Sequence, residues 1–223
     1  MLNKFLTALF GVAAFFLIIT FSIALPIYCR FFYYMQIESL NLPLATGYDF
    51  ETIKAAYDEV LNFLTLPSAP FGTGVFKFTE DGKAHFYDCK VLFNLNLSVL
   101  IISLVTFLTI FILDKKKIIT LSRPFNMSVC FISALSIFLV FGILAIVIAI
   151  DFDTAFTIFH HVFFPGKDNW LFDPRYDQIL NILPQDFFMS CAILIGASII
   201  LISVGIIVFQ LIKRKKESEK DNF

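Results

Sequence analysis

The side chains best suited to chemistry gather at two places in the chain. The stretch KAHFYDCK, residues 83–90, brings a histidine, an aspartate, a cysteine and a lysine together just before a long apolar run. His85 lies in this stretch, and the only other histidines are the adjacent pair His160 and His161, in TIFHHVFFPGKDNW beside another apolar run. Imidazole titrates near neutral pH, so two histidines that meet can act as general base and general acid.

The spacing within the first stretch indicates a shared face. If this stretch is helical, His85, Asp88 and Cys89 stand at positions i, i+3 and i+4 and lie side by side. Asp88 is then placed to hold the imidazole of His85 in one tautomer. Lys90 either extends its amine to the lipid headgroups or pairs with a carboxylate or phosphate of a substrate.

Two other chemistries compete with the histidine pair. A zinc site built from His85, His160, His161 and Asp88 is consistent with the ligands that zinc takes. Adjacent histidines seldom bind the same ion, however, and no HExxH-type spacing occurs. A cysteine nucleophile at Cys89 with His85 as its base is the second alternative, although nothing else in the stretch activates that thiol.

The composition predicts an integral membrane protein. Hydrophobic residues make up 58% of the 223 residues, against about 45–50% in soluble domains. A bilayer-spanning helix needs about 20 mostly apolar residues, and the first such run is too long for a signal peptide and lacks a cleavage site. We therefore expect an all-α protein with four transmembrane helices, free of charged residues, over residues 5–28, 91–113, 126–150 and 187–212.

Basic residues predict the orientation of these helices. Lysine and arginine gather in the connection 114–125 and in the tail 213–223, which we expect to be a disordered, solvated segment. Such residues favour the cytoplasmic side. Both termini are therefore expected in the cytoplasm, and the loops 29–90 and 151–186 outside, where all three histidines lie.

The first outer loop is long enough to form a small extracytoplasmic cap. We expect an amphipathic helix that begins after Asp49 and ends before Pro67. The stretch VFKFTEDGKAHF predicts a short strand or hairpin with a turn at Asp81–Gly82, and the second long helix is expected to begin at about Ala84. The apolar stripe of the amphipathic helix consists of Ile53, Ala56, Tyr57, Val60, Leu61 and Leu64.

The second outer loop has no strand pattern and is rich in irregularly spaced aromatic residues. Trp and Tyr are enriched at membrane interfaces, so this loop is expected to lie there. Its cluster of Phe163, Phe164, Trp170 and Phe172 forms either interfacial packing or a pocket for acyl chains, and the 30 phenylalanines of the chain make the pocket more credible.

These motifs resemble the bacterial lipoprotein intramolecular transacylase family over essentially the whole chain. The family pattern is roughly H-x-x-D-x-K before the second span, F-H-x-x-F-F and a Trp after the third, and L-P-x-x-F-F before the fourth. The resemblance favours His160 over His161 as the functional member of the pair. The matching positions are His85, Asp88, Lys90, Phe159, His160, Phe163, Phe164, Trp170, Leu183, Pro184, Phe187 and Phe188.

The resemblance implies a specific reaction without a cofactor. The enzyme would move the sn-2 acyl chain of a diacylglyceryl lipoprotein onto the α-amino group of its N-terminal cysteine, giving a lyso-form lipoprotein. His85 and His160 would be catalytic, in contact with membrane lipid and not with nucleic acid. The alternatives are a metal-dependent lipid hydrolase and a non-enzymatic protein that binds lipid or a partner. Supporting or substrate-binding positions would be Asp88, Lys90, Tyr87, Phe159, His161, Phe163, Phe164 and Trp170.

Overall fold

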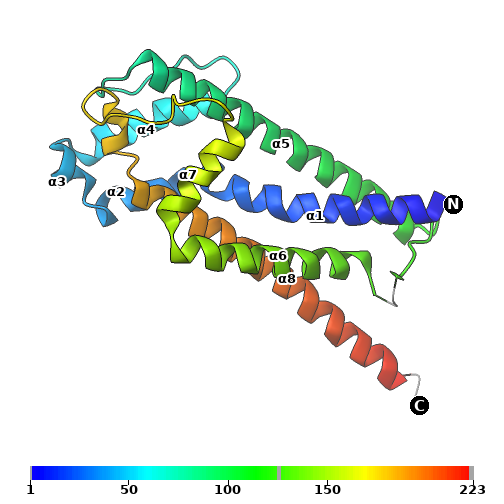
Figure 1. Cartoon of the computed structure of the whole chain (residues 1–223). Coiled ribbons are helices and arrows are strands. Elements are labelled where there is room, and N and C mark those ends of the chain that lie inside the picture. The colour runs from blue at the N-terminus through cyan, green and yellow to red at the C-terminus, as the bar shows by residue number, and fades with distance from the viewer. Residues whose placement is uncertain (1, 125–126, 221–223) are drawn as a thin grey trace. The chain divides into compact units, whose positions relative to one another are not determined.

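The computed structural model describes residues 2–124 and 127–220, and every regular element within them is a helix (Figure 1). Asn126, where we expected the third span to begin, lies outside the described residues, as do the ends of the predicted loop 114–125 and tail 213–223. The elements are α1 (Leu2–Tyr28), α2 (Arg30–Ser39), α3 (Leu42–Thr46), α4 (Phe50–Thr65), α5 (Glu80–Lys115), α6 (Val129–Ile150), α7 (Phe152–Phe163), the 3₁₀ helix η2 (Gln178–Asn181) and α8 (Gln185–Lys220).

Four of these helices, α1, α5, α6 and α8, are long and apolar enough to cross a membrane, which confirms the predicted four-span class. The chain divides into two compact units. The membrane unit comprises the described parts of 1–23, 97–147 and 195–223, and the cap unit comprises 24–96 and 148–194.

Small residues allow close packing within the membrane unit. The hydroxyl of Ser133 on α6 donates to the carbonyl of Gly11 on α1 at 2.9 Å. A Cβ at Gly11 would overlap the side chain of Val129, so the approach of α6 requires glycine there. Transmembrane helices commonly associate through such small residues, because lipid provides no hydrophobic driving force between them.

The amphipathic helix predicted for the first outer loop is confirmed as α4. Asp49 is its N-cap and accepts from the backbone N–H of Thr52 at 2.8 Å, which satisfies one of the free donors at the helix start. The helix ends at Thr65, two residues before Pro67. All six residues of the predicted apolar stripe are buried, so this face of α4 belongs to the hydrophobic core of the cap unit.

A stack of tyrosines links α2, α4 and the second outer loop inside the cap unit. The rings of Tyr33 and Tyr57 are nearly parallel with their centroids 3.6 Å apart, and Phe187 meets Tyr33 edge-on. The Tyr33 hydroxyl is fully buried and donates to the carbonyl of Ile182 at 2.7 Å. A buried hydroxyl without a partner is costly, so this bond fixes the position of the loop over the core.

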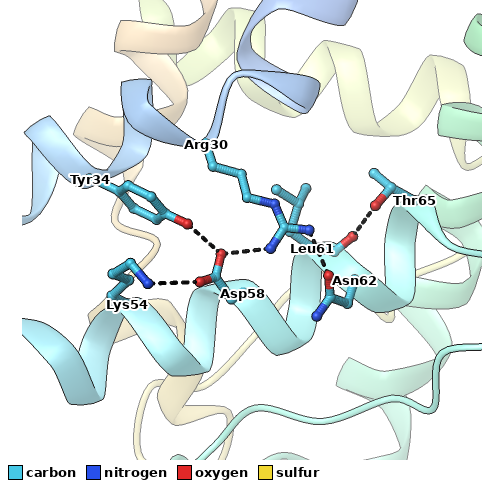
Figure 2. Close-up of polar contacts among 7 residues, drawn as sticks. All are labelled: Arg30, Tyr34, Lys54, Asp58, Leu61, Asn62 and Thr65. Carbon is cyan, nitrogen blue, oxygen red and sulfur yellow. Dashed lines mark hydrogen bonds and ion pairs between the residues drawn. The ribbon is translucent and has the colours of Figure 1, made fainter.

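A polar network holds α2 across α4 (Figure 2). The carboxylate of Asp58 accepts from Arg30 at 2.8 Å, from the Tyr34 hydroxyl at 2.7 Å and from Lys54 at 3.3 Å. The guanidinium of Arg30 also donates to the side chain of Asn62 at 2.6 Å. Because one carboxylate serves three donors, the side chains that bind it are ordered together, which stabilises the network more than isolated surface pairs would.

The prediction of a strand or hairpin in VFKFTEDGKAHF is wrong. Residues 71–79 form turns and irregular backbone, and α5 begins directly after them, so Asp81–Gly82 lies in a helical first turn and not in a hairpin. Gly82 has a packing role instead, because a Cβ there would overlap the carboxylate of Asp177. Two consecutive acidic residues, Glu80 and Asp81, suit the positive end of the helix dipole.

Two further expectations from the sequence are corrected. The second outer loop is not irregular, because it contains α7 and η2, and the basic tail continues α8 as helix to Lys220. The overlooked signal for α7 is the spacing of Phe152, Phe156, Phe159 and Phe163, which is helical, after Asp151, whose side chain accepts from the backbone N–H of Thr154.

Candidate active site

His85 is positioned by the beginning of α5, which Asp177 caps from the second outer loop. The carboxylate of Asp177 accepts from the backbone N–H of Thr79 at 2.8 Å and from its hydroxyl at 2.9 Å. Next to this cap, Gln178 donates its backbone N–H to the carbonyl of Lys77 and accepts the Lys77 N–H on its side chain. These bonds fix the loop against the helix just before His85.

His160 is positioned by the last turn of α7. Its Nδ1 lies 2.7 Å from the carbonyl oxygen of Phe156, one turn earlier on the helix. A carbonyl accepts only, so Nδ1 carries the hydrogen and the lone pair of His160 is on Nε2. The phenyl ring of Phe156 lies against the imidazole, with the centroids 4.2 Å apart.

The structure brings His85 and His160 together inside the cap unit. Their ring centroids are 5.7 Å apart with 30° between the planes, and each residue is at most 7% exposed. Phe164 packs against His85 with a centroid distance of 4.8 Å, and Trp170 stacks on His160 at 4.6 Å. The aromatic rings of Phe164 and Trp170 therefore help to separate both imidazoles from bulk solvent.

Burial sets the charge of both imidazoles. Burial, with a smaller contribution from the nearby ring of His160, lowers the pKa of His85 to about 4. The pKa of His160 is also lowered, first by burial and then by His161, against the opposing effect of the bond to the Phe156 carbonyl. At neutral pH both rings are therefore neutral, and each has one N–H and one lone pair.

Asp88 connects α5 to the turn after α7. Its carboxylate accepts from the ammonium of Lys167 and, at 3.0 Å, from the amide nitrogen of Asn169. Desolvation acts to raise the pKa of Asp88, but the bonds from Lys167 and Asn169 outweigh it and hold the pKa below its usual value. The sequence suggested that Asp88 orients His85 directly, whereas in the structure its oxygens are engaged by these two residues.

Cys89 lies beside His85 but is poorly suited to be a nucleophile. Its Sγ is 3.4 Å from the Nε2 of His85. Burial, with a smaller contribution from the carboxylate of Asp88, raises the pKa of the Cys89 thiol to about 12. The thiolate is the reactive form, so at neutral pH this thiol stays protonated and is available as a weak hydrogen-bond donor to the imidazole.

Two of the predicted supporting residues face away from the histidines. Tyr87 is exposed, and its ring meets the edge of Phe63 on α4 at 4.8 Å. Lys90 donates to the carbonyl of Leu66, the C-cap of α4, at 2.9 Å and lies over the Phe63 ring. A cation at a helix C-terminus is stabilising, so Lys90 is occupied in binding α5 to α4.

The outer face of α7 carries three further candidates. Phe159 and Phe163 are about half exposed, and their rings pack on each other with centroids 4.6 Å apart. His161 is exposed and meets Trp170 edge-on. In the described part of the chain, no three His, Cys, Asp or Glu side chains converge as a metal site would require, so the quartet of the zinc alternative is not assembled.

Two residues near the histidines escaped the sequence analysis, Lys167 and Asn169, which bind Asp88. Phe172, a member of the predicted aromatic cluster, meets His85 edge-on at 5.4 Å. The polar run KDNW inside an aromatic loop was the available signal. This run lies near His85 because the chain turns at Gly166, whose φ of +72° is favourable for glycine. After the turn, Asn169 contacts Asp88, some 80 positions earlier in the chain.

Comparison with known proteins identifies the family. The profile of the lipoprotein intramolecular transacylase Lit matches residues 8–188. The chain belongs to this family. The lipoprotein intramolecular transacylases are membrane-integral acyltransferases, so this chain is an enzyme and a multi-pass membrane protein.

Solved structures of a relative agree in fold. The in meso structure of the membrane-integral lipoprotein intramolecular transacylase Lit from Bacillus cereus superimposes with a TM-score of 0.85 at 23% identity, over 97% of this chain and 98% of that one. A second structure of that protein, with a histidine mutated to alanine, gives 0.77 at 23% identity over 98% and 96% of the two chains. Comparison with curated protein sequences gave no match.

The buried histidine predicts a pH dependence of stability. The pKa of His85 is about 4 in the folded protein and about 6.5 in the unfolded chain. Below pH 6.5 the unfolded chain therefore binds a proton that the folded protein lacks. We expect the contribution of His85 to the free energy of unfolding to be constant above pH 6.5. Between pH 6.5 and 4 this free energy should decrease by on the order of 3 kcal/mol.

Unfolding midpoints in detergent at several pH values measure this effect. In His85→Gln the decrease should be flatter, because glutamine cannot take up the proton. His161→Gln is the matched control, since this side chain is on the surface, and should retain the dependence of the natural protein. Equal pH slopes in His85→Gln and the natural protein would show that His85 is not the group responsible.

Proposed function

We propose that this enzyme transfers the sn-2 acyl chain of a diacylglyceryl lipoprotein to the α-amino group of the lipoprotein's own N-terminal cysteine. The product is the N-acylated, monoacylglyceryl lyso-form. The observation that carries the proposal is the pair of buried, neutral imidazoles of His85 and His160, 5.7 Å apart, in a chain of the transacylase family. No nucleic acid takes part.

Two neutral histidines balance the protons of this reaction. The α-amino group has a pKa of about 8 and arrives mostly as an ammonium. One imidazole takes a proton from it, and the free amine attacks the ester carbonyl. The second imidazole takes a proton from the nitrogen after attack and then releases it to solvent, because the ammonium loses one proton more than the alcohol gains. The first returns its proton to the glyceryl oxygen as the C–O bond breaks, leaving an amide and an alcohol.

Nucleophile and ester belong to one molecule, so no covalent enzyme intermediate is needed. The difficulty is to bring the two groups together, and holding reactive groups in the right geometry is a large catalytic factor. Phe164 and Trp170 surround the imidazoles and are placed to confine the head of the substrate. The half-exposed rings of Phe159 and Phe163 offer apolar surface to membrane lipid or to an acyl chain.

The reaction also requires the site to lie on the side where lipoproteins are processed. We place both termini and the 114–125 connection in the cytoplasm and the cap unit outside, from the positive-inside rule. In a background without the four natural cysteines, an impermeant thiol reagent applied to intact cells should label Glu51→Cys on α4 but neither Lys116→Cys nor Ser218→Cys. Labelling of the last two with Glu51→Cys protected would reverse the orientation.

Mass spectrometry of a diacylated lipopeptide tests the reaction itself. Incubation with the pure enzyme should leave the mass unchanged while fragmentation shows an acyl group on the α-nitrogen. His85→Ala and His160→Ala should each reduce the initial rate by about 10²–10⁴, as is typical for loss of an acid–base group. Asp88→Asn should have an intermediate effect. The double histidine variant should lose much less than the product of the two, because the pair acts as a unit.

His161→Ala is the matched control for the pair and should be the mildest of the histidine variants, because its side chain is exposed. A normal rate in His160→Ala with an inactive His161→Ala would reverse the assignment within the pair. Loss of one acyl chain from the lipopeptide would identify a hydrolase. An unmodified lipopeptide with the natural enzyme would favour the non-enzymatic lipid-binding alternative.

Cys89→Ala should keep most of the activity, because the thiol is protonated at neutral pH and the substrate amine attacks directly. The same assay measures its initial rate, with Cys29→Ala as a control outside the site. An inactive but folded Cys89→Ala protein, together with an acyl-thioester trapped on the natural enzyme, would support the cysteine mechanism instead.

A further inference from the structure

Two buried polar atoms of the cap unit have no hydrogen-bond partner among the described residues. They are Nδ1 of His85 and Oδ1 of Asn169. Buried polar atoms are nearly always paired, so each such atom requires an explanation. Both residues are tied to the same group, because Asn169 donates to Asp88, which lies one turn after His85 on α5.

The bond to Asp88 determines which way the Asn169 amide points. A carboxylate only accepts, so the group that faces Asp88 is the NH₂ and the oxygen is turned away from it. This oxygen only accepts, whereas Nδ1 of His85 is able to donate. Asp88 stands three residues after His85 on α5, so the two side chains share one face of the helix, and the amide that Asp88 binds lies on that face. In agreement, Asn169 acts to raise the pKa of His85 against the effect of burial.

We infer that Asn169 is a positioning residue that accepts a hydrogen bond from Nδ1–H of His85 and thereby places the lone pair of this imidazole on Nε2. The inference deepens the proposed function and rests on it. On the opposite side of the ring the Cys89 thiol lies 3.4 Å from Nε2, and a protonated thiol is a donor to that lone pair. Both neighbours of the ring therefore favour the same tautomer.

The same tautomer is imposed on His160 by a different device, the Phe156 carbonyl at its Nδ1. The two imidazoles then meet the substrate as two Nε2 acceptors, as the proton balance of the transfer requires. Asp88 and Lys167 act on His85 through Asn169. The ammonium of Lys167 binds the carboxylate of Asp88, and this carboxylate in turn binds the amide of Asn169. The titratable groups around His85 are His160, Asp88, Cys89 and Lys167.

Nitrogen NMR of ¹⁵N-histidine-labelled enzyme in detergent tests this directly, since the chain has three histidines that single substitutions assign. At pH 7.5 the natural enzyme should show His85 with its hydrogen on Nδ1. Asn169→Leu, of similar size without the acceptor, should shift His85 to a mixture of tautomers, whereas Asn169→Gln, which keeps the amide, should retain the original one. His160 should keep its tautomer in both variants and serves as the internal control.

Rates in the lipopeptide assay give the second readout. Asn169→Leu should lower kcat by about 10–100-fold, by analogy with partners that orient metal-ligating histidines, with little change in KM, and Asn169→Gln should recover part of the loss. Lys167→Ala is the matched control that loosens the loop but leaves the amide in place, and should cost less than Asn169→Leu.

A natural enzyme with the His85 hydrogen on Nε2, or an Asn169→Leu variant with the tautomer unchanged, would overturn the inference. A changed tautomer with an unchanged kcat would also overturn it, because positioning would then have no catalytic effect. The NMR measurement needs no turnover. If the natural enzyme fails to transfer the acyl group, the proposed function fails, while the tautomer still decides the role of Asn169.

Discussion

The buried carboxylate of Asp177 is the constraint on which the geometry of the site depends. It caps the beginning of α5 through the backbone and hydroxyl of Thr79, from a position almost a hundred residues later in the chain. The fit is tight, because only a glycine at position 82 leaves room for it. This side chain thus satisfies the backbone N–H of Thr79, directly before α5, and holds the loop that carries Phe172 and Asn169 against the start of the helix on which His85 lies.

Burial of the two imidazoles connects this packing with chemistry. An exposed histidine with an ordinary pKa would be protonated in a fraction of the molecules near neutrality, and the protonated form cannot accept a proton from an ammonium. In the cap unit, the aromatic rings of Phe164, Phe172 and Trp170 remove solvent from His85 and His160, and the pKa of each falls. The same apolar wall that suits an acyl chain therefore also keeps the bases free.

The sequence predicted those elements whose signal is local. Hydrophobic length identified the four long helices, and the periodicity of apolar residues after Asp49 identified α4 with its cap and its buried face. The strand in VFKFTEDGKAHF was wrong because an acidic helix start and a turn share the residues Asp and Gly, and the acceptor that decides between them, Asp177, is remote in sequence. Asn169 was missed for the same reason, since its partner Asp88 is brought to it by tertiary contacts.

Helix geometry decides which of the adjacent residues His160 and His161 faces the site, a choice that residue type alone leaves open. Successive residues on an α-helix point about 100° apart, so two adjacent histidines cannot both face one core. On α7 the inward row contains Phe156, His160 and, just past its end, Phe164, at intervals of four residues, and His161 turns outward. The carbonyl that fixes the tautomer of His160 belongs to this same row. The burial, the ring packing and the tautomer of His160 thus follow from its position on α7. His161, one position later, is exposed and lies outside this row.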